Sequence, residues 1–251
     1  MAKYVAVAGK GGVGKTTFTA LLLRQIVKNN NISVLAVDAD PNANLNEALG
    51  LEVTATISEL LEETKNPKAI PVGMPKDVFV EYRLQQTLVE SEDIDLLVMG
   101  GPQGPGCYCY PNDLLRKYLE NLGSNYDLIA VDTEAGLEHI SRRTIPHVDT
   151  MFVISDSSAR GIRSAGRVND LIKGLHSAVG EVYLVVTKTT DNDINSLSEE
   201  IEKTGLKLIG EIPLDPLVSE LDLAGKPLYT LPDESKAVQA VKKILERTQI
   251  F

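Results

Sequence analysis

Short apolar runs alternate with longer amphipathic stretches along most of the chain. The runs are rich in Val, Ile and Leu, which is typical of parallel strands covered by helices on both faces. They predict strands at Tyr4–Ala8, Val34–Val37, Leu96–Met99, Leu128–Val131, Met151–Ile154, Val182–Val186 and Leu208–Gly210. The amphipathic stretches predict helices at 15–29, 113–122, 160–174, 194–203 and 234–247. This alternation predicts an α/β fold with a doubly wound, mostly parallel sheet flanked by helices, whose ligands bind beyond the carboxyl ends of the strands.

Two segments interrupt the alternation. The stretch from Lys65 to Pro75 holds three Pro and one Gly and is interpreted as an insertion. The stretch from Gly100 to Pro111 holds three Pro and four Gly around two cysteines. It is expected to form a long loop at the binding edge of the sheet, ahead of a helix that begins near Asn112 or Asp113, and long loops in this position usually have a function.

The composition narrows the classes of function. A chain of 251 residues with 43% hydrophobic and 24% charged residues fits a single globular domain, 1–251. The net charge of −10, with scattered Lys and Arg, disfavours nucleic-acid binding. No apolar run approaches the ~20 residues that span a bilayer, and the chain starts without a signal-peptide pattern. We therefore expect a cytoplasmic protein with no stable membrane association.

A glycine-rich loop joins the first predicted strand to the first predicted helix. Residues Gly9 to Thr16 match the phosphate-binding motif G-x-x-x-x-G-K-[ST] in its expected strand–loop–helix context. Its backbone N–H groups can converge on phosphate oxygens at a helix N-terminus. Lys15 is expected to reach the β- and γ-phosphates, and the Thr16 hydroxyl to ligate Mg²⁺. The predicted nucleotide ligands are Gly11, Gly12, Val13, Gly14, Lys15, Thr16 and Thr17.

A second lysine, Lys10, stands at the second position of this loop. As a single feature it could be a solvated surface charge. The run Lys10 to Thr17, however, resembles the signature of the deviant Walker family of ATPases, which includes ParA, MinD and the nitrogenase iron protein. The resemblance covers nearly the whole chain. It implies ATP as ligand, an ATP-dependent homodimer, and a Lys10 that crosses the dimer interface to act catalytically on the partner's ATP.

Acidic residues follow two predicted strands, as in that family. Asp38 and Asp40 close the second strand at the position of switch I. The resemblance gives Asp40 the catalytic task of orienting or deprotonating the attacking water, and places Asp38 near the outer shell of the metal. An Asx turn around Pro41 is the alternative for either residue. Asp132 resembles the Walker B aspartate that holds Mg²⁺, and Gly136 could supply an amide near the γ-phosphate and a hinge.

The adenine side is less marked in the sequence. Relatives often carry Asn at the end of the late strand where this chain has Thr187. The segment from Glu211 to Pro216, with Pro213 and Asp215, resembles the family's adenine-side loop, whose contacts are largely made by the backbone. The resemblance thus implies nucleotide contacts at Thr187, Pro213 and Asp215.

The two cysteines are Cys107 and Cys109. A helix N-terminus beside them would favour thiolates, which suit Zn²⁺ and Ni²⁺. One chain offers two sulfurs, whereas a closed thiolate site needs four, and a two-fold dimer would supply the second pair. Metal binding and a pair of half-buried cysteines without a ligand are both compatible with the spacing.

The cysteine segment also resembles a particular branch of the family. Gly106 to Cys109, followed by Asn112 and Arg116, and the segment Ala135 to His139 resemble the CooC group of nickel-insertion ATPases. This implies carbon monoxide dehydrogenase or acetyl-CoA synthase as the nickel enzyme served. The Cys-x-Cys pair departs from the separate cysteines of nitrogenase iron proteins, which disfavours electron transfer. A MinD- or ParA-like positioning ATPase and a scaffold that carries an iron–sulfur cluster are the alternatives.

Overall fold

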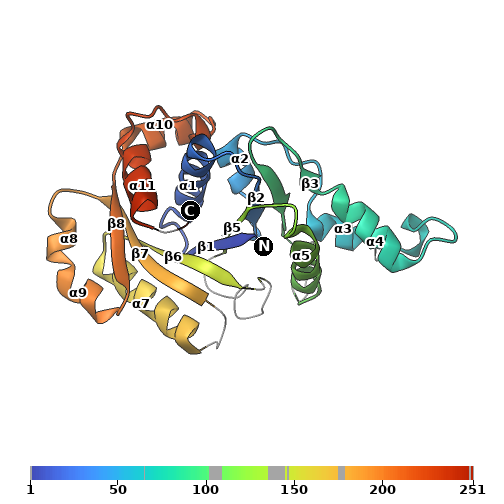
Figure 1. Cartoon of the computed structure of the whole chain (residues 1–251), viewed down its shortest axis with the longest axis horizontal. Coiled ribbons are helices and arrows are strands. Elements are labelled where there is room, and N and C mark those ends of the chain that lie inside the picture. The colour runs from blue at the N-terminus through green and yellow to red at the C-terminus, as the bar shows by residue number, and fades with distance from the viewer. Residues whose placement is uncertain are drawn as a thin grey trace.

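The chain folds around one twisted β-sheet (Figure 1). The computed structural model describes residues 2–64, 66–101, 109–134, 145, 147–174, 179–248 and 250. Within these, eight strands form the order β3-β4-β2-β5-β1-β6-β7-β8, parallel except for β3 against β4. The strands are β1 (Lys3–Gly9), β2 (Val34–Asp38), β3 (Leu88–Val89), β4 (Asp95–Val98), β5 (Leu128–Asp132), β6 (Val148–Asp156), β7 (Val179–Thr189) and β8 (Lys207–Pro213). The mostly parallel α/β architecture predicted from the sequence is confirmed.

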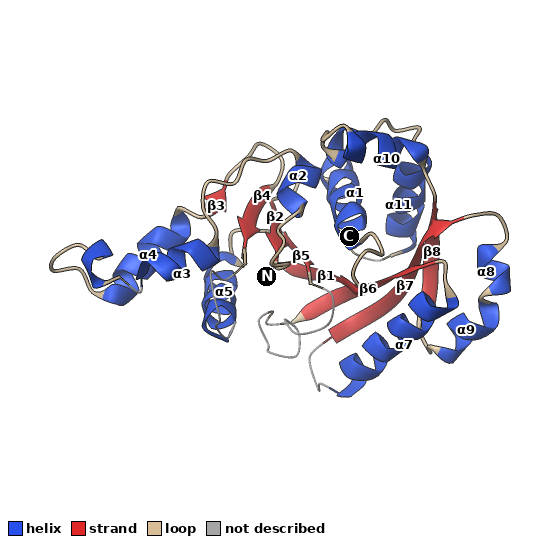
Figure 2. Ribbon diagram, turned by 180° about the vertical axis from the view of Figure 1, so that it is seen from behind, coloured by secondary structure: helices blue, strands red, loops and turns tan. Residues whose placement is uncertain are grey.

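Helices cover both faces of the sheet (Figures 1 and 2). One face carries α1 (Lys15–Asn29), α2 (Leu45–Leu49), α10 (Pro216–Leu223), the 3₁₀ turn η2 (Leu228–Thr230) and α11 (Lys236–Arg247). The other carries α5 (Cys109–Leu122), α7 (Ala159–Gly174), α8 (Asp193–Ser196) and α9 (Ser198–Lys203). The alternation of side chains along β1 explains the two cores, since Tyr4, Ala6 and Ala8 join one buried cluster and Val5 and Val7 the other.

Several elements differ from the sequence-based expectations. The helix expected at 194–203 is two helices, α8 and α9, divided at Leu197. Helix α5 begins at Cys109, earlier than expected, because Pro111 is compatible with a first helical turn, where a missing N–H costs nothing. The short α2 and α10 and the two-residue β3 were not predicted. Each is too short for its periodicity to stand out.

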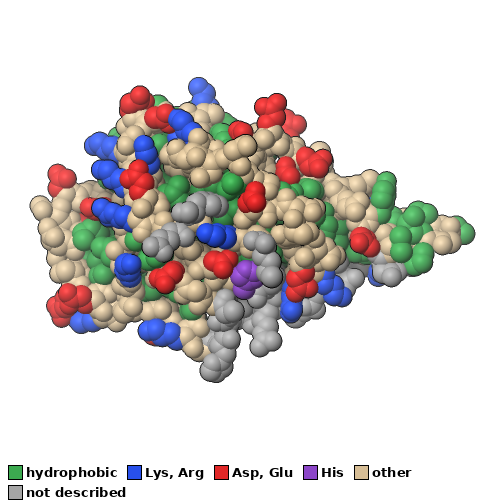
Figure 3. Space-filling view, in the orientation of Figure 1, with side chains coloured by type: hydrophobic (Ala, Val, Ile, Leu, Met, Phe, Trp, Pro, Cys, Tyr) green, Lys and Arg blue, Asp and Glu red, His purple; other side chains and the backbone are tan. Residues whose placement is uncertain are grey.

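The residues around the expected insertion form an arm at the β3 edge of the sheet (Figures 1 and 2). Helices α3 (Ile57–Thr64) and α4 (Lys76–Gln85), which the sequence did not predict, are joined by the 3₁₀ turn η1 (Pro67–Ala69) and a further turn. Exposed apolar side chains lie along the arm (Figure 3), at Val72, Val78 and Tyr82. In the described part of the chain, no helix is long and apolar enough to cross a membrane.

Candidate nucleotide-binding site

The phosphate loop between β1 and α1 depends on its glycines. A side chain at Gly9 would bring its Cβ within 2.4 Å of the Ile154 carbonyl oxygen of β6, so only glycine fits there. Gly12 and Gly14 have φ of 78° and 90°, in the left-handed region that glycine adopts without strain. Successive turns of this kind point backbone N–H groups into a shared concavity that suits an anion.

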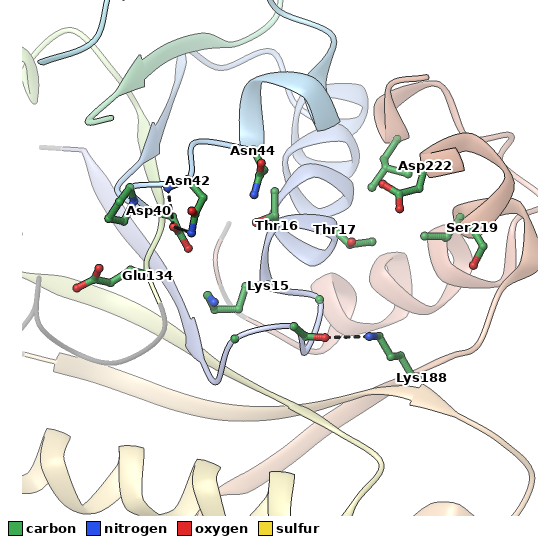
Figure 4. A pocket seen from close by; sticks show the side chains of 16 residues that line it. Lys15, Thr16, Thr17, Asp40, Asn42, Asn44, Glu134, Lys188, Ser219 and Asp222 are labelled. Carbon is green, nitrogen blue, oxygen red and sulfur yellow. Dashed lines mark hydrogen bonds between the residues drawn. The ribbon is translucent and has the colours of Figure 1, made fainter. Parts of the chain in front are cut away.

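Lys15 and Thr16 begin α1 at the bottom of this concavity. Lys15 is buried, with 7% of its surface exposed, and lines the cavity above the loop (Figure 4). The Thr16 hydroxyl donates to Asp132 Oδ2 over 2.6 Å, which joins the helix to the end of β5. Thr19, one turn further along α1, lies 3.4 Å from the other carboxylate oxygen of Asp132.

Asp132 and Asp38 are buried side by side at the ends of β5 and β2. Their Cα atoms are partners in the parallel ladder. Burial raises the pKa of Asp132 to about 7, although the Thr16 hydrogen bond lowers it, and the neighbouring Asp38 raises it further. Burial likewise raises the pKa of Asp38 to about 6, against hydrogen bonds from the backbone of Leu45 and Asp40. Asp38 thus fixes the loop that follows β2, and it is not among the residues that line the cavity above the phosphate loop.

Asp40 lines the cavity from that loop. The Asx turn considered for this segment is present, because Asp40 Oδ1 accepts hydrogen bonds from the Asn42 backbone N–H and the Asn42 side-chain amide, both at 2.9 Å (Figure 4). The second carboxylate oxygen has no hydrogen bond among the described residues. The water-orienting role of Asp40 therefore stays a prediction that the geometry permits.

The cavity above the loop measures about 590 Å³, within the range of small-molecule sites. Of the residues singled out from the sequence, Gly11, Gly12, Gly14, Lys15, Thr16, Thr17 and Asp40 line it. Sequence reasoning did not single out its other polar side chains, which are Asn42, Asn44, Glu134, Lys188, Ser219 and Asp222. Lys188 follows Thr187 and Glu134 lies midway between Asp132 and Gly136, whereas Ser219 and Asp222 lie on α10, which had no clear periodic signal.

A smaller cavity of about 100 Å³ adjoins the loop on the β7–β8 side. Thr17, Thr187, Pro213 and Asp215 line it together with apolar side chains, which suits an adenine ring. The Thr187 hydroxyl and the Asp215 carboxylate are both engaged in hydrogen bonds to other groups of the protein. Asp215 caps α10 through the Leu217 N–H and accepts from Ser235 Oγ and the Ala237 N–H. Any contact from Asp215 to a base would therefore come from its backbone.

Other residues that the sequence analysis assigned to the site do not contribute a described side chain to either cavity. The Val13 side chain is buried in the core, so only its backbone can serve a phosphate. Lys10 is exposed and does not line the cavity of its own chain. Gly136 and Cys107 fall outside the described residues, and for Cys109 only the backbone, at the first residue of α5, is described.

The donors at the loop fit Mg²⁺. The Thr16 hydroxyl and the Asp132 carboxylate are hard oxygen ligands, held in contact beside Lys15. Elsewhere in the described part of the chain, no group of three or more His, Cys, Asp or Glu side chains is arranged to hold a metal.

Comparison with known proteins agrees with this site. Residues 4–228 match the family described as the CobQ/CobB/MinD/ParA nucleotide binding domain. The chain belongs to this family. Its members are P-loop ATPases, so the chain is an ATPase, for which ATP and Mg²⁺ are the expected ligands.

Individual relatives span nearly the whole chain. An uncharacterized ATP-binding protein of Methanocaldococcus jannaschii is 43% identical over 246 residues, 97% of either chain. The carbon monoxide dehydrogenase accessory protein CooC of Rhodospirillum rubrum is 30% identical, over 97% of this chain and 96% of its own. Among solved structures, the septum site-determining protein MinD of Pyrococcus horikoshii, complexed with Mg-ADP, has a TM-score of 0.71 at 22% identity. That match covers 98% of this chain and 95% of the MinD chain.

Proposed function

We propose that this ATPase works as a nucleotide-gated homodimer that carries Ni²⁺ or Zn²⁺ on Cys107 and Cys109. Its task would be to assist nickel insertion into carbon monoxide dehydrogenase or acetyl-CoA synthase. The observation that carries the proposal is the Cys-x-Cys motif in a chain 30% identical, over almost its full length, to a carbon monoxide dehydrogenase accessory protein. The metal is the cargo of the reaction, distinct from the Mg²⁺ that accompanies ATP.

The fold offers a short physical connection from the nucleotide to the cysteine segment. The Met99 N–H donates to the Asp38 carbonyl over 2.8 Å, so the end of β4 is bonded to the start of the loop that bears Asp40. Gly101 lies so close to this loop that a Cβ would be 3.2 Å from the Pro41 carbonyl oxygen. A shift of residues 38–42 would therefore displace residues 99–101, which lead into the cysteine segment.

A symmetric dimer fits the remaining features. The exposed Lys10 beside the loop is free to reach a partner's nucleotide, because it makes no hydrogen bond or ion pair within the described part of its own chain. Two-fold symmetry would bring two copies of the Cys107 and Cys109 pair together and give a four-thiolate shell, tetrahedral for Zn²⁺. Nucleotide-dependent association could then assemble and release the metal site.

Each residue of the phosphate site has a task in this scheme. Lys15 binds the β- and γ-phosphates, and Thr16 and Asp132 would hold Mg²⁺, which would supply positive charge to the phosphate oxygens. Asp40 orients the water that attacks the γ-phosphate. Lys10 of the partner subunit adds a second positive charge where negative charge is displaced toward the leaving oxygen.

The alternative is a MinD- or ParA-like positioning ATPase that acts on membrane or DNA. Helix α11 carries an apolar stripe, a pattern that would suit a membrane surface as well as a packed helix. In the structure, Val238, Val241 and Ile244 of that stripe are at most 1% exposed, since α11 packs on β8 and α1. Sedimentation with anionic vesicles and ATP tests this alternative directly. Nucleotide-dependent cosedimentation would favour it over metal delivery.

Metal titration of the purified protein, followed by size-exclusion chromatography, tests the proposal. We expect about half a Ni²⁺ or Zn²⁺ per chain and a shift from monomer to dimer. The double variant Cys107→Ser/Cys109→Ser should lose both while retaining ATP binding. His139→Ala, which removes another metal-capable side chain in the segment that follows Asp132, serves as the matched control and should keep the stoichiometry. Unchanged metal binding by the double variant would refute the proposal, and visible absorbance of protein purified anaerobically would point to an iron–sulfur cluster instead.

A further inference from the structure

Two consecutive residues at the end of β7 hold the phosphate loop by its carbonyl groups. The Thr187 hydroxyl lies 2.6 Å from the Val13 carbonyl oxygen and 3.1 Å from that of Ser155. Lys188 Nζ donates to the Gly12 carbonyl oxygen over 2.8 Å (Figure 4). The loop that follows β1 is thereby tied to a strand that lies two positions away in the sheet, beyond β6.

The contacts from Thr187 and Lys188 to the loop carbonyls also determine which way the backbone N–H groups of the loop point. In a planar trans peptide the C=O and the next residue's N–H point in opposite directions. Drawing the Gly12 and Val13 carbonyls toward β7 therefore turns the N–H groups of Val13 and Gly14 away from β7. Because Gly14 lines the large cavity, an amide turned in this way can serve a phosphate oxygen there.

The backbone at Lys188 is arranged to make this contact. Lys188 has φ of 57°, a left-handed conformation that is unfavourable for a residue with a side chain. The pairing of β7 with β8 shifts register between Thr187 and Thr189, so Lys188 is the extra residue of an irregularity in the ladder. Such irregularities redirect a side chain and often lie next to functional sites. Here Ser157 Oγ donates to the Lys188 carbonyl and helps to hold it.

Lys188 also stands between the two cavities. It lines the large cavity above the loop and the small apolar cavity toward β8. Its methylene stem can cover one face of a purine ring, while its ammonium group remains on the Gly12 carbonyl. No other lysine in the described part of the chain lines both cavities.

We propose that Lys188 is a positioning residue for the nucleotide of this ATPase. Its ammonium group keeps the phosphate loop in the shape that binds phosphate, and its stem forms a wall of the base site. The inference rests on ATP binding by this chain and is independent of the cysteine proposal. Thr187 supports the same loop from the neighbouring position.

Two substitutions separate the two tasks. Lys188→Met keeps an unbranched stem but removes the ammonium group, and it should weaken binding of MgATP and of inorganic triphosphate by a similar factor, about tenfold. Lys188→Gly relieves the left-handed backbone but removes the stem too, and it should weaken MgATP more than triphosphate. Lys188→Arg should restore part of the binding lost in Lys188→Met. Lys173→Met, an exposed lysine in the last turn of α7, is the control and should bind both ligands as the parent does.

Isothermal titration with both ligands, together with thermal melting without nucleotide, is the measurement. A role confined to folding would lower the melting temperature of Lys188→Met while leaving its affinities for MgATP and triphosphate unchanged once the protein is folded. That result would overturn the proposal. Parent-like affinity of Lys188→Met for both ligands at unchanged stability would overturn it equally. If Lys188→Gly weakened MgATP and triphosphate by the same factor, the assignment of the stem to the base site would be wrong.

Discussion

Asp38 and Asp132 face each other across the parallel ladder of β2 and β5, with both carboxyl groups buried beside the phosphate loop. Two carboxylates so close would repel each other in a low-dielectric setting, which favours the protonated form. Burial raises the pKa of each carboxyl group, to about 6 for Asp38 and about 7 for Asp132, and the neighbouring Asp38 adds to the rise in the pKa of Asp132. Lys15 and the Thr16 hydroxyl act in the opposite direction on Asp132.

This pair predicts a particular pH dependence of stability for the nucleotide-free protein. Between the unfolded pKa of about 4 and the folded values, the native state binds more protons than the unfolded state, so this contribution to stability falls as pH rises. Asp132→Asn keeps an acceptor for Thr16 but cannot ionise, and its stability should depend less on pH between 4 and 7. Thermal melts at several pH values measure this difference from the parent.

The control for this pH dependence is Asp233→Asn. Asp233 is exposed, and hydrogen bonds from Lys28 and Arg24 lower its pKa, so its contribution is lost only as pH falls below the usual Asp range. The slope of stability between pH 5 and 7 should therefore be the same as in the parent. An unchanged slope in Asp132→Asn as well would show that Asp132 does not hold a proton in the native state in this pH range.

Asp40 offers a test that separates catalysis from loop structure. Asp40→Asn retains the side-chain oxygen that accepts from the Asn42 N–H, so the Asx turn can persist without the negative charge. We expect nucleotide affinity to stay near that of the parent while turnover falls by about 10²–10⁴-fold, the range for loss of a group that activates water. Steady-state ATPase rates and ATP binding provide the two measurements.

Lys15→Ala and Asn42→Ala complete this experiment. Lys15→Ala should lose tight ATP binding, because it removes the buried cation of the loop. Asn42→Ala disturbs the turn but leaves the Asp40 carboxylate, so it should retain more turnover than Asp40→Asn. Turnover near that of the parent in Asp40→Asn would remove Asp40 from the water-activating role.

The central sheet and the phosphate loop could be predicted because their signals are local. The buried parallel strands are nearly continuous apolar runs, as at Leu128–Asp132, and the loop motif fixes glycines whose φ values depend on few other residues. The arm formed by α3 and α4 could not be predicted in the same way. Its helices are short and depend on tertiary packing, of α3 on α4 and α5, and the Ser58 hydroxyl of α3 donates to the Gly100 carbonyl just after β4.

The site residues that could not be predicted from the sequence reach the cavity through the tertiary arrangement of the chain, which leaves no local signal. Lys188 reaches the phosphate loop through a left-handed backbone and a shift in strand register, neither of which a periodic pattern reveals. Asp222 lines the cavity from α10, a short helix that begins at the Asp215 cap and has no clear periodic signal. Contacts between residues more than 170 positions apart, such as Thr187 with Val13, come from the order of strands in the sheet.

Asp215 is expected to contribute to stability through its cap. Its carboxylate is 5% exposed and accepts hydrogen bonds from Leu217, Ser235 and Ala237, which connect the start of α10 to the start of α11. Asp215→Ala should lower the free energy of unfolding by about 1–3 kcal/mol because it leaves buried donors unpaired. For a chain of this length that corresponds to roughly 2–10 °C in Tm.

Asp222→Ala, an exposed acidic residue on the same helix, is the control for Asp215 and should change Tm by no more than about 1–2 °C, as is usual for exposed positions. Although burial opposes ionisation of Asp215, the hydrogen bonds from Ser235, Ala237 and Leu217 outweigh it and lower its pKa. Its stabilising effect should therefore persist to pH values below 4. Equal Tm values for Asp215→Ala and the parent would mean that other groups satisfy the three donors.

Lys10 provides the sharpest test of the dimer. It is exposed beside the phosphate loop and does not line the cavity of its own chain, so we expect it to act on the nucleotide of a partner. Lys10→Ala should bind ATP but dimerise poorly and hydrolyse slowly, and Asp40→Asn should be inactive for a different reason. In a mixed dimer of the two variants, the subunit with the intact Asp40 receives the intact Lys10 of its partner, so one of the two sites is complete and activity should partly return. If Lys10 acted within its own chain, neither site of the mixed dimer would be complete. Mixed dimers verified by two affinity tags that remain inactive would therefore refute action across the interface.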